Sequence, residues 1–402
     1  MRVALLSREY PPDVYGGAGV HVEYLARELS AHEDVTVHKW GVQGAGEGSP
    51  RVLGHEAWDA LAGSAPRLAA LRAVSIDLTM AAAAEGAEVV HSHTWYANFG
   101  GHLAKLLYGI PHVATAHSLE PLRPWKAEQL GGGYALSMFC ERTAIENADA
   151  VIAVSRGMAD DILACYPTVD PARVHVIYNG IDTAEYAPDP GTDVLARHGV
   201  DPGRPSVVFV GRITRQKGVE HLLEAAGSFD PAAQLVLCAG APDTPELGAE
   251  VARRVDELQS QRDGVIWIDE MLPKPDVIQL LSHATVFACP SIYEPLGIVN
   301  LEAMACEAAV VATATGGIVE VVVEDETGLL VPFEPSDDGV RTPVDPAGFA
   351  AAIAERVNAL VRDTARAEAM GRAGRQRVLE HFAWPAIAEQ TSALYRQVAG
   401  VA

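Results

Sequence analysis

Cysteine is scarce in this sequence. Five cysteines occur in 402 residues, and no two of them have C-x-x-C spacing. This count argues against a disulfide framework, a thiolate metal site and a dithiol redox motif. Because Cys238 and Cys289 lie within apolar segments, we expect reduced cysteines in the core of a cytoplasmic protein.

Positive charge is also in short supply. Lysine and arginine total 30 against 53 aspartates and glutamates, which gives a formal net charge of −23 at pH 7. Nucleic-acid binding requires a basic surface, and an anionic bilayer repels so acidic a protein. We therefore expect neither nucleic acid nor a membrane as a partner, while local basic clusters can still attract phosphates.

Long hydrophobic runs are absent. No stretch of the sequence approaches the about 20 apolar residues that a membrane-spanning helix requires. The apolar run at residues 3–6 is too short for a signal peptide and is followed directly by charged residues and prolines. Both observations favour a cytoplasmic location.

What the sequence does contain is a regular alternation of short apolar strands and amphipathic helices. A chain of 402 residues exceeds what one core usually supports, and this alternation is typical of α/β domains with parallel sheets. The predicted strands span residues 2–6, 35–40, 88–92, 112–116, 150–154, 174–177, 206–211, 234–239, 265–268, 285–289, 309–313 and 328–331. Helices are predicted at 345–362 and 365–381, with a last helix ending at 398, and the turn at 179–182 is predicted to cross between two domains.

Two carboxylates flank a glycine-opened helix in the second half. Gly297 precedes an apolar run that begins with Ile298 and has helical spacing, so its free N–H groups form an anion site. Glu294 lies in the loop before the helix, and Glu302 lies about 7.5 Å along its axis. The pair is placed to reach opposite sides of a bound diphosphate, one at sugar hydroxyls and the other at a ribose.

A basic turn follows the strand predicted at 206–211. Arg212 and Lys217 lie between that strand and a predicted helix, in a segment that matches neither a Walker loop nor G-x-G-x-x-G. The two side chains offer a bidentate fork and a point charge to a diphosphate. Solvated surface charges are the alternative for each of them taken alone.

In the first half, a glycine turn and a histidine follow predicted strands. Gly16, Gly17 and Gly19 open a helix that runs to residue 29, where a backbone without side chains lets an anion approach closely. His117 ends the strand at 112–116, the position where open α/β sheets present residues to a ligand. A purely structural role is the alternative for both features.

Further candidates for acceptor contacts lie nearby in the sequence. Trp95 and Tyr96 follow the strand at 88–92 and could stack on a sugar ring or pack in the core. Arg123 and Lys126 flank Trp125 in a proline-bearing loop after His117. Two cations beside an aromatic ring suit a phosphorylated acceptor, with surface salt bridges as the alternative.

These motifs together resemble the retaining glycosyltransferases of family four over nearly the whole chain. The resemblance implies two facing Rossmann-like domains of the GT-B type with a cleft between them. It also implies that the last helix returns to the first domain, so the expected domains are 1–181 plus 384–402 for the acceptor and 182–383 for the nucleotide-sugar donor. The segments 115–126 and 128–134 resemble more narrowly the actinobacterial members that form maltose 1-phosphate.

The resemblance also implies roles for the residues. Arg212 and Lys217 would bind the donor diphosphate, Glu294 the donor sugar and Glu302 the ribose, while His117 would face the reacting sugar. The donor site is then expected at Gly16, Gly17, Gly19, Arg212, Lys217, Glu294, Gly297, Ile298 and Glu302, with His117, Arg212, Lys217 and Glu294 as the catalytic set. The acceptor site is expected at Trp95, Tyr96, Arg123 and Lys126.

The implied reaction transfers glucose from ADP-glucose to glucose 1-phosphate with retention. One alternative is a synthase that elongates α-1,4-glucan, although glycogen-elongating synthases of another bacterial family carry a lysine where this chain has Val14. Another is a non-catalytic sugar-phosphate sensor, and an epimerase of the same fold is a third. Residues 269–272 are a candidate contact for adenine.

No cofactor or metal is expected, because the resemblance assigns charge neutralisation to the two cations. His91 and His93 share one face of a predicted strand, and we expect no further ligands nearby, which argues against a metal there. A homodimer is compatible with the sequence, which does not determine the oligomeric state.

Overall fold

The structure is a computed structural model that describes residues 1–14, 16–42, 49–62, 66–124, 126–127 and 131–401. The chain divides into two compact units, one of Met1–Gly180 with Trp384–Ala402 and the other of Ile181–Ala383. No helix among the described residues is long and apolar enough to cross a membrane.

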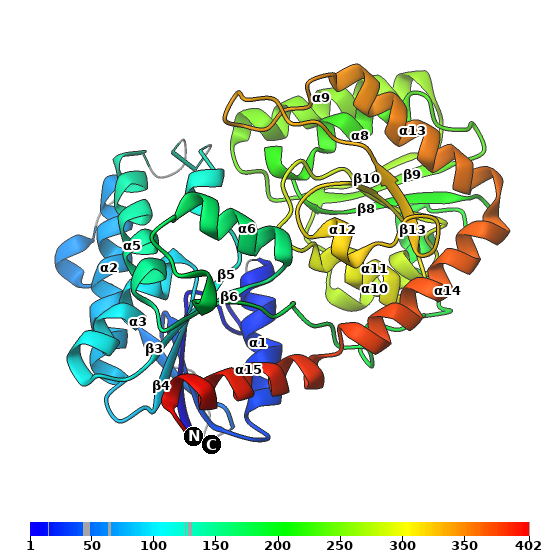
Figure 1. Ribbon diagram of the computed structural model, residues 1–402. Coiled ribbons are helices and arrows are strands. Elements are labelled where there is room, and N and C mark those ends of the chain that lie inside the picture. The colour runs from blue at the N-terminus through cyan, green and yellow to red at the C-terminus, as the bar shows by residue number, and fades with distance from the viewer. Residues whose placement is uncertain (15, 43–48, 63–65, 125, 128–130, 402) are drawn as a thin grey trace. The chain divides into compact units, whose positions relative to one another are not determined.

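The first unit is built on a parallel sheet of seven strands in the order β3-β2-β1-β4-β5-β6-β7 (Figure 1). The strands are β1 (Arg2–Ser7), β2 (Asp34–Trp40), β3 (Arg51–His55), β4 (Val89–His93), β5 (His112–Ala116), β6 (Ala150–Ala153) and β7 (Val174–Val176). The six strands predicted for this half are confirmed to within a residue or two. β3 was missed, because this short edge strand pairs on one side only, with β2, and lacks a continuous apolar run.

Alternating side chains of β1 explain why helices cover both faces of this sheet. Ala4 and Leu6 pack against one group of helices, and Val3 and Leu5 against another. The first group is α2 (Pro66–Ala83) and α3 (Trp95–Tyr108), with α5 (Tyr134–Asn147) packed on α3. The second group is α1 (Gly17–Leu29) and α15 (Trp384–Ala399), and α6 (Arg156–Cys165) lies beside β6 and β7.

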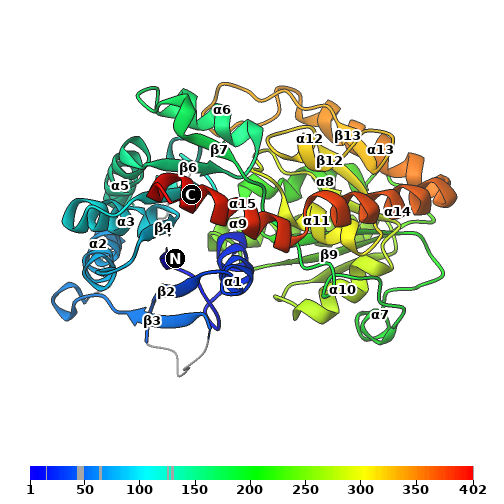
Figure 2. The same ribbon diagram turned by 60° about the horizontal axis from the view of Figure 1, so that its bottom comes forward.

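The last helix belongs to the first unit, although its neighbours in sequence belong to the second. α15 lies alongside α1, as Figure 2 shows in red and blue. Its Trp384 ring stacks on Tyr24 at 5.9 Å between centroids, and Trp384 is 2% exposed. The backbone at Gly180 is so close to this ring that an added Cβ would lie 2.5 Å from Trp384 Cδ2. This apolar contact fixes the returning helix.

The second unit contains a six-stranded parallel sheet in the order β10-β9-β8-β11-β12-β13. Its strands are β8 (Ser206–Arg212), β9 (Gln234–Gly240), β10 (Val265–Ile268), β11 (Val286–Cys289), β12 (Ala309–Thr313) and β13 (Gly328–Val331), all of which confirm the prediction. A core of valines, leucines and phenylalanines joins one face of the sheet to α8 (Val219–Ala226), α9 (Pro245–Gln261) and α13 (Pro346–Arg362). The strands also contact α10 (Lys274–Ser282), α11 (Ile298–Ala305) and α14 (Thr364–His381), drawn on the other side in Figure 1. Short helices α7 (Asp193–His198) and α12 (Ile318–Val321) complete the unit.

Both sheets reverse their strand order at one point. In the first sheet the order runs outward from β1 in one direction and from β4 in the other, and in the second sheet from β8 and β11. All strands are parallel, so their carboxyl ends share one edge, and ligands of open α/β sheets bind outside that edge at the point of reversal. The fold therefore points to the segments that follow β1, β4, β8 and β11.

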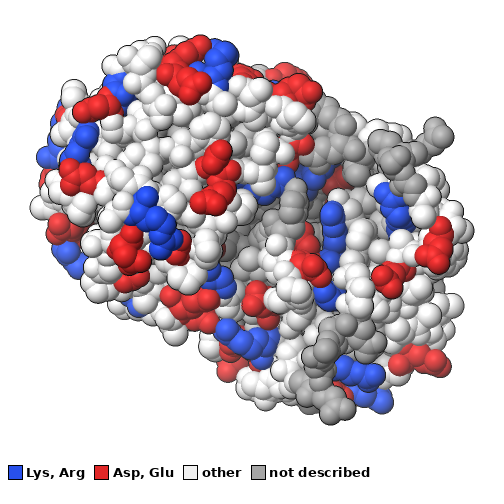
Figure 3. Space-filling model, turned by 180° about the vertical axis from the view of Figure 1, so that it is seen from behind, with Lys and Arg blue, Asp and Glu red and all other residues white. Residues whose placement is uncertain are grey.

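Acidic and basic side chains are interspersed on the face of the molecule seen in Figure 3. No single-sign area dominates that view, despite the net charge of −23. Local cations can therefore act on a ligand independently of the overall charge.

We expect Trp384→Ala to lower the free energy of unfolding by about 3–5 kcal/mol, because it empties a buried aromatic site between α15, α1 and β-sheet residues. Trp58→Ala is the matched control, since Trp58 is 51% exposed, and it should change stability by less than about 0.5 kcal/mol. Urea denaturation followed by circular dichroism measures both. Equal denaturation midpoints for the two variants would contradict the packing role of Trp384.

Candidate functional site

The reversal point of the second sheet carries a close pair of opposite charges. Lys217 ends a 3₁₀ turn (Arg215–Lys217) after β8, and Glu294 lies in the loop after β11. Lys217 Nζ donates to Glu294 Oε2 at 2.7 Å, and the two side chains are 23% and 9% exposed. The topology thus brings together two of the residues that the sequence assigned to the donor.

The backbone around Lys217 is held by local bonds. The Thr214 hydroxyl caps the turn by accepting from Lys217 N, and Ile292 N donates to Gln216 O at 2.9 Å, which ties the turn to the loop of Glu294. Gly218 then adopts φ +62°, and an added Cβ would lie 2.2 Å from Pro290 O. Only glycine allows this approach without strain.

The backbone and side chain of Glu294 are also fixed. Ser291 Oγ donates to Glu294 Oε2 at 3.1 Å, and Gly317 N donates to Glu294 O at 3.0 Å. At Gly316, with φ +51°, an added Cβ would lie 2.0 Å from Glu294 O. A carboxylate held in this way is preorganised to accept hydrogen bonds from a ligand.

The charges at this point influence one another. Burial lowers the pKa of Lys217, but Glu294 and further negative groups outweigh this effect and raise it, so the ammonium keeps its charge. Burial raises the pKa of Glu302, opposed by the hydrogen bond that Tyr186 Oη donates to Glu302 Oε1 at 3.0 Å. Glu302 is among the groups that raise the pKa of Lys217, which places both carboxylates within electrostatic reach of one ammonium.

The helix that follows Glu294 and contains Glu302 begins where it was predicted. Gly297 is the residue before α11 with φ +90°, and Ile298 is the first helical residue. The side chain of Asn300 in the first turn is buried, and neither its oxygen nor its nitrogen has a hydrogen-bond partner among the described residues. The first turn of α11 thus carries a buried side-chain amide without a partner among the described residues.

Arg212 is directed to a partner that the sequence analysis did not single out. It ends β8, and its Nη2 donates to Asp243 Oδ1 at 2.5 Å in the loop after the neighbouring β9. The loop at 269–272 follows β10, and its Asp269 carbonyl approaches the Gly240 backbone closely enough to lie 3.0 Å from an added Cβ.

In the first unit, the glycine turn contacts a carboxylate. Gly16 precedes α1, which contains Gly17 and Gly19, and Gly16 N donates to Glu9 Oε2 at 2.7 Å. An added Cβ at Gly19 would lie 2.8 Å from the same oxygen. The glycines therefore admit the Glu9 side chain at the helix start, where the sequence predicted a bound anion.

His117 belongs to a cluster of imidazoles. His93 Nδ1 lies 3.1 Å from His117 Nε2, and the His21 ring meets the His117 ring edge-on at 4.7 Å between centroids. His91 bridges Thr115 and Tyr395, at 2.6 Å from each hydroxyl. Burial, followed by repulsion from neighbouring histidines, lowers the pKa of His117 and His93 well below the ordinary value. The cluster is therefore neutral, and His117 can serve as a hydrogen-bond partner and not as a cation.

The expectation that His91 and His93 have no further ligands nearby is wrong. His21, His93 and His117 offer nitrogen atoms that all lie within 4.8 Å of one another. They come from α1 and the ends of β4 and β5, which only the parallel sheet brings together. Nitrogen ligands of tetrahedral zinc lie about 3.3 Å apart, given bonds of about 2.0–2.1 Å, so a metal would require some of these rings to move.

The four acceptor candidates separate into different environments. Trp95 is 3% exposed in an apolar cluster with Ala70 and Cys140, which matches the core alternative for this side chain. Tyr96 is half-buried and lies 4.2 Å from the guanidinium carbon of Arg8. Arg123 Nη1 donates to Ser118 Oγ at 2.8 Å. Lys126 N donates to Arg123 O, and Trp125 and 128–130 lie outside the described residues.

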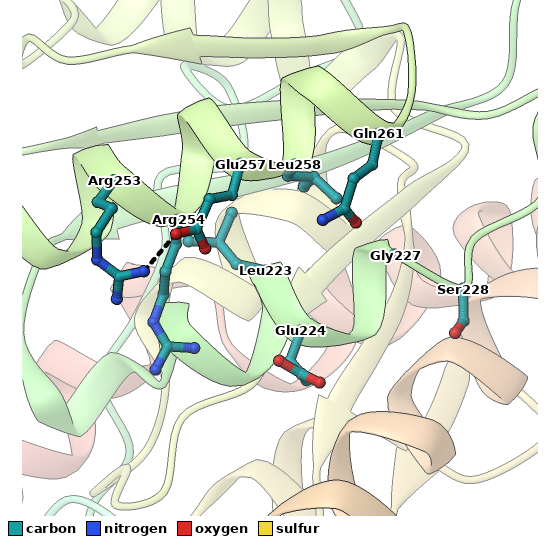
Figure 4. Close-up of a pocket in the computed structure, with 9 residues that line it drawn as sticks. All are labelled: Leu223, Glu224, Gly227, Ser228, Arg253, Arg254, Glu257, Leu258 and Gln261. Carbon is teal, nitrogen blue, oxygen red and sulfur yellow. Dashed lines mark hydrogen bonds and ion pairs between the residues drawn. The ribbon is translucent and has the colours of Figure 1, made fainter.

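A hollow in the second unit, shown in Figure 4, lies away from these candidates. It is lined by residues from the C-terminal halves of α8 and α9, including the Arg253–Glu257 ion pair. Helices that connect parallel strands end near the amino edge of the sheet. This hollow is therefore at the edge opposite to Lys217 and Glu294 and offers them no ligand space.

Sequence reasoning missed several polar residues that contact the candidates. They are Arg8, Glu9, His21, Asp243 and Ser291. Each of them except His21 lies within three residues after the end of a parallel strand, which is the signal that could have found them.

Comparison with known proteins identifies the family of the chain. Residues 15–185 match the family model described as Glycosyltransferase Family 4, and residues 193–377 match the model described as Glycosyl transferases group 1. The alpha-maltose-1-phosphate synthase of Mycolicibacterium smegmatis is 57% identical over 99% of this chain and 100% of its own length. The chain belongs to glycosyltransferase family 4.

Three further comparisons give lower identities. An alpha-maltose-1-phosphate synthase of Mycobacterium tuberculosis is 56% identical over 99% of this chain and 100% of its own. A glycogen synthase of the same organism is only 27% identical, over 98% and 94%. The solved sucrose-phosphate synthase of Thermosynechococcus elongatus superposes with a TM-score of 0.79 at 27% identity and covers 99% of both chains. The two parallel-sheet domains are therefore those of GT-B glycosyltransferases.

We expect Gly218→Ala to destabilise the second unit more than Gly199→Ala. Both glycines have positive φ, at +62° and +72°, but an added Cβ meets Pro290 O at 2.2 Å only in the first case and nothing within 4 Å in the second. The left-handed backbone alone costs an alanine about 1–2 kcal/mol. Any further loss of unfolding free energy in Gly218→Ala therefore measures the contact of the new Cβ with Pro290 O. Urea unfolding curves of the two variants provide the comparison, and equal losses would show that the turn shifts without cost.

Proposed function

We propose that the chain is a retaining glucosyltransferase that moves glucose from ADP-glucose to glucose 1-phosphate and forms maltose 1-phosphate. The observation that carries this proposal is the 57% identity, over 99% of the chain, to the alpha-maltose-1-phosphate synthase of M. smegmatis. Elongation of glycogen is the second candidate, and the lower identity of 27% to a glycogen synthase argues against it.

The donor is proposed to bind at the reversal point of the second sheet. Lys217 supplies a point charge to the diphosphate and is held there by Glu294 at 2.7 Å. The Glu294 carboxylate is proposed to accept further hydrogen bonds from hydroxyl groups of the glucose. The Glu302 carboxylate is proposed to accept hydrogen bonds from hydroxyl groups of the ribose. Arg212 donates to the outer phosphate from its position beside Asp243, and residues 269–272 contact the adenine.

The proposed chemistry breaks the bond between C1 of glucose and the phosphate oxygen and forms a bond from C1 to an acceptor hydroxyl oxygen. The acceptor attacks on the face from which the diphosphate leaves, so the configuration is retained. Its proton passes to the departing phosphate oxygen, and ADP and maltose 1-phosphate are the products. Cationic donors aimed at the leaving group are worth about 3–4 kcal/mol each in such a step.

The proposal needs no metal or cofactor, because Lys217 and Arg212 neutralise the leaving group. His117, kept neutral by burial, is proposed to hold a hydroxyl of the transferred sugar. The first unit takes the acceptor, and the enzyme is proposed to work in the cytoplasm.

With ADP-glucose as donor, we expect a higher kcat/KM for glucose 1-phosphate than for glycogen, and maltose 1-phosphate as the product identified by mass spectrometry. A preference for glycogen would assign the chain to the polymer synthases. If the protein binds ADP-glucose but releases no ADP with any acceptor tested, it is a sensor and not a transferase.

Lys217→Ala should lower kcat by about 10²–10³, because a charged donor to the leaving group is removed. Lys105→Ala is a suitable control, since Lys105 also pairs with a carboxylate, Asp149 at 2.8 Å, but on α3 of the other unit. Steady-state release of ADP measures both. Turnover of Lys217→Ala within a few-fold of the control would remove Lys217 from the mechanism.

A further inference from the structure

The carboxyl edge of the first sheet carries an arginine that the proposed function does not use. Arg8 directly follows β1, and its guanidinium carbon lies 5.3 Å from the centroid of the Trp40 ring and 4.2 Å from that of Tyr96. Trp40 ends β2, and Tyr96 follows β4, the two neighbours of β1 in the sheet. Arg8 therefore lies at the reversal point of the first sheet, where a ligand is expected.

The charge of Arg8 lacks a carboxylate partner. Within the described part of the chain, no ion pair or hydrogen bond joins Arg8 to an acid, whereas Arg212 and Lys217 each have one at 2.5 Å and 2.7 Å. The aromatic rings cover a flat side of the guanidinium, and Arg8 also donates a hydrogen bond to the Tyr96 hydroxyl. Neither contact neutralises the positive charge. In a chain of net charge −23, a half-buried arginine that has no carboxylate partner among the described residues points to an anionic ligand.

A second guanidinium acts on the same tyrosine. Burial raises the pKa of Tyr96, while the positive charges of Arg8 and Arg123 oppose this rise. Arg123 lies beyond β5, the next strand after β4 in the sheet. The three residues thus follow the ends of three strands that are adjacent in the sheet, β1, β4 and β5.

Several donors in this group have no acceptor. Arg123 Nε and Trp40 Nε1 are buried, and neither finds a hydrogen-bond partner among the described residues. Unsatisfied buried N–H groups are costly and call for an oxygen-rich ligand. The nearby acid Glu120 is 1% exposed, lies 4.0 Å from Arg123 and accepts from Ser137, so it offsets Arg123 and leaves the charge of Arg8 for the ligand.

We infer that Arg8, Tyr96 and Arg123 form the subsite for the phosphate group of the acceptor, with Arg8 as its principal cation. The inference rests on the proposed function, which requires a phosphorylated acceptor in the first unit. A phosphate presents oxygens in the geometry that a guanidinium fork binds in pairs, and the Tyr96 hydroxyl is within electrostatic reach of both guanidinium groups. The subsite confers selectivity for a sugar phosphate over the same sugar without phosphate.

The test compares Arg8→Gln with Arg2→Gln. Arg2 stands at the amino end of the same strand, 63% exposed beside Glu88, and is a matched control at the opposite edge. Arg8→Gln should raise the KM for glucose 1-phosphate by about 10–100-fold, as expected for loss of hydrogen bonds to a charged group. The KM for ADP-glucose should stay within about two-fold of the wild type, and Arg2→Gln should change neither constant.

Acceptors without phosphate provide an independent readout. Transfer to free glucose, measured as release of ADP, should be equally slow in the wild type and Arg8→Gln, because the substituted group meets only the phosphate. Arg8→Lys keeps the positive charge but loses the two-pronged guanidinium, so its KM for glucose 1-phosphate should lie between those of the wild type and Arg8→Gln. If circular dichroism shows that Arg8→Gln is unfolded, the KM of Arg8→Lys for glucose 1-phosphate tests the subsite in its place.

The outcomes separate the subsite from the reaction. If the wild type forms no product from glucose 1-phosphate, the proposed function is overturned and the subsite with it. If the wild type is active and Arg8→Gln keeps its KM for glucose 1-phosphate, only the subsite is overturned. Equal increases in both KM values, or an equal loss with free glucose, would likewise refute a phosphate-specific role for Arg8.

Discussion

Parallel pairing of the strands is the constraint on which the candidate sites depend. When every strand of a sheet runs in the same direction, the segments that follow the strands all emerge at one edge. In the second unit this rule brings Lys217, which follows β8, within 2.7 Å of Glu294, which follows β11, although 77 positions separate them in the chain. The same rule brings Arg8, Tyr96 and the histidine cluster to one edge in the first unit.

The positively charged residues at the two candidate sites differ in whether a carboxylate neutralises them. Lys217 and Arg212 each have a carboxylate partner, which fixes their positions. Such preorganisation reduces the cost of ordering charged groups at the moment of reaction. Arg8 is held by aromatic rings instead, an arrangement that fixes its plane and leaves its charge for a ligand.

Close backbone contacts explain why glycines are needed near Lys217 and Glu294. Gly218 and Gly316 have positive φ and face the carbonyl oxygens of Pro290 and Glu294. Both residues therefore clamp the loop that follows β11. Gly16 and Gly19 similarly admit Glu9 at the start of α1. In each case the missing side chain allows one segment to hold another that carries a charge.

The sequence by itself determined twelve of the strands, the glycine-started helix at Gly297 and the residue types suited to a nucleotide-sugar, because hydrophobic period and helix signals are local properties. It did not reveal β3, whose short edge pairing leaves little apolar pattern. Tertiary structure alone decided that Arg212 meets Asp243, that Trp95 is buried, that His21 joins His93 and His117, and that Arg8 lies beside Tyr96. These contacts join residues far apart in the chain, and their partners are selected by the order in which strands pair, which no local pattern encodes.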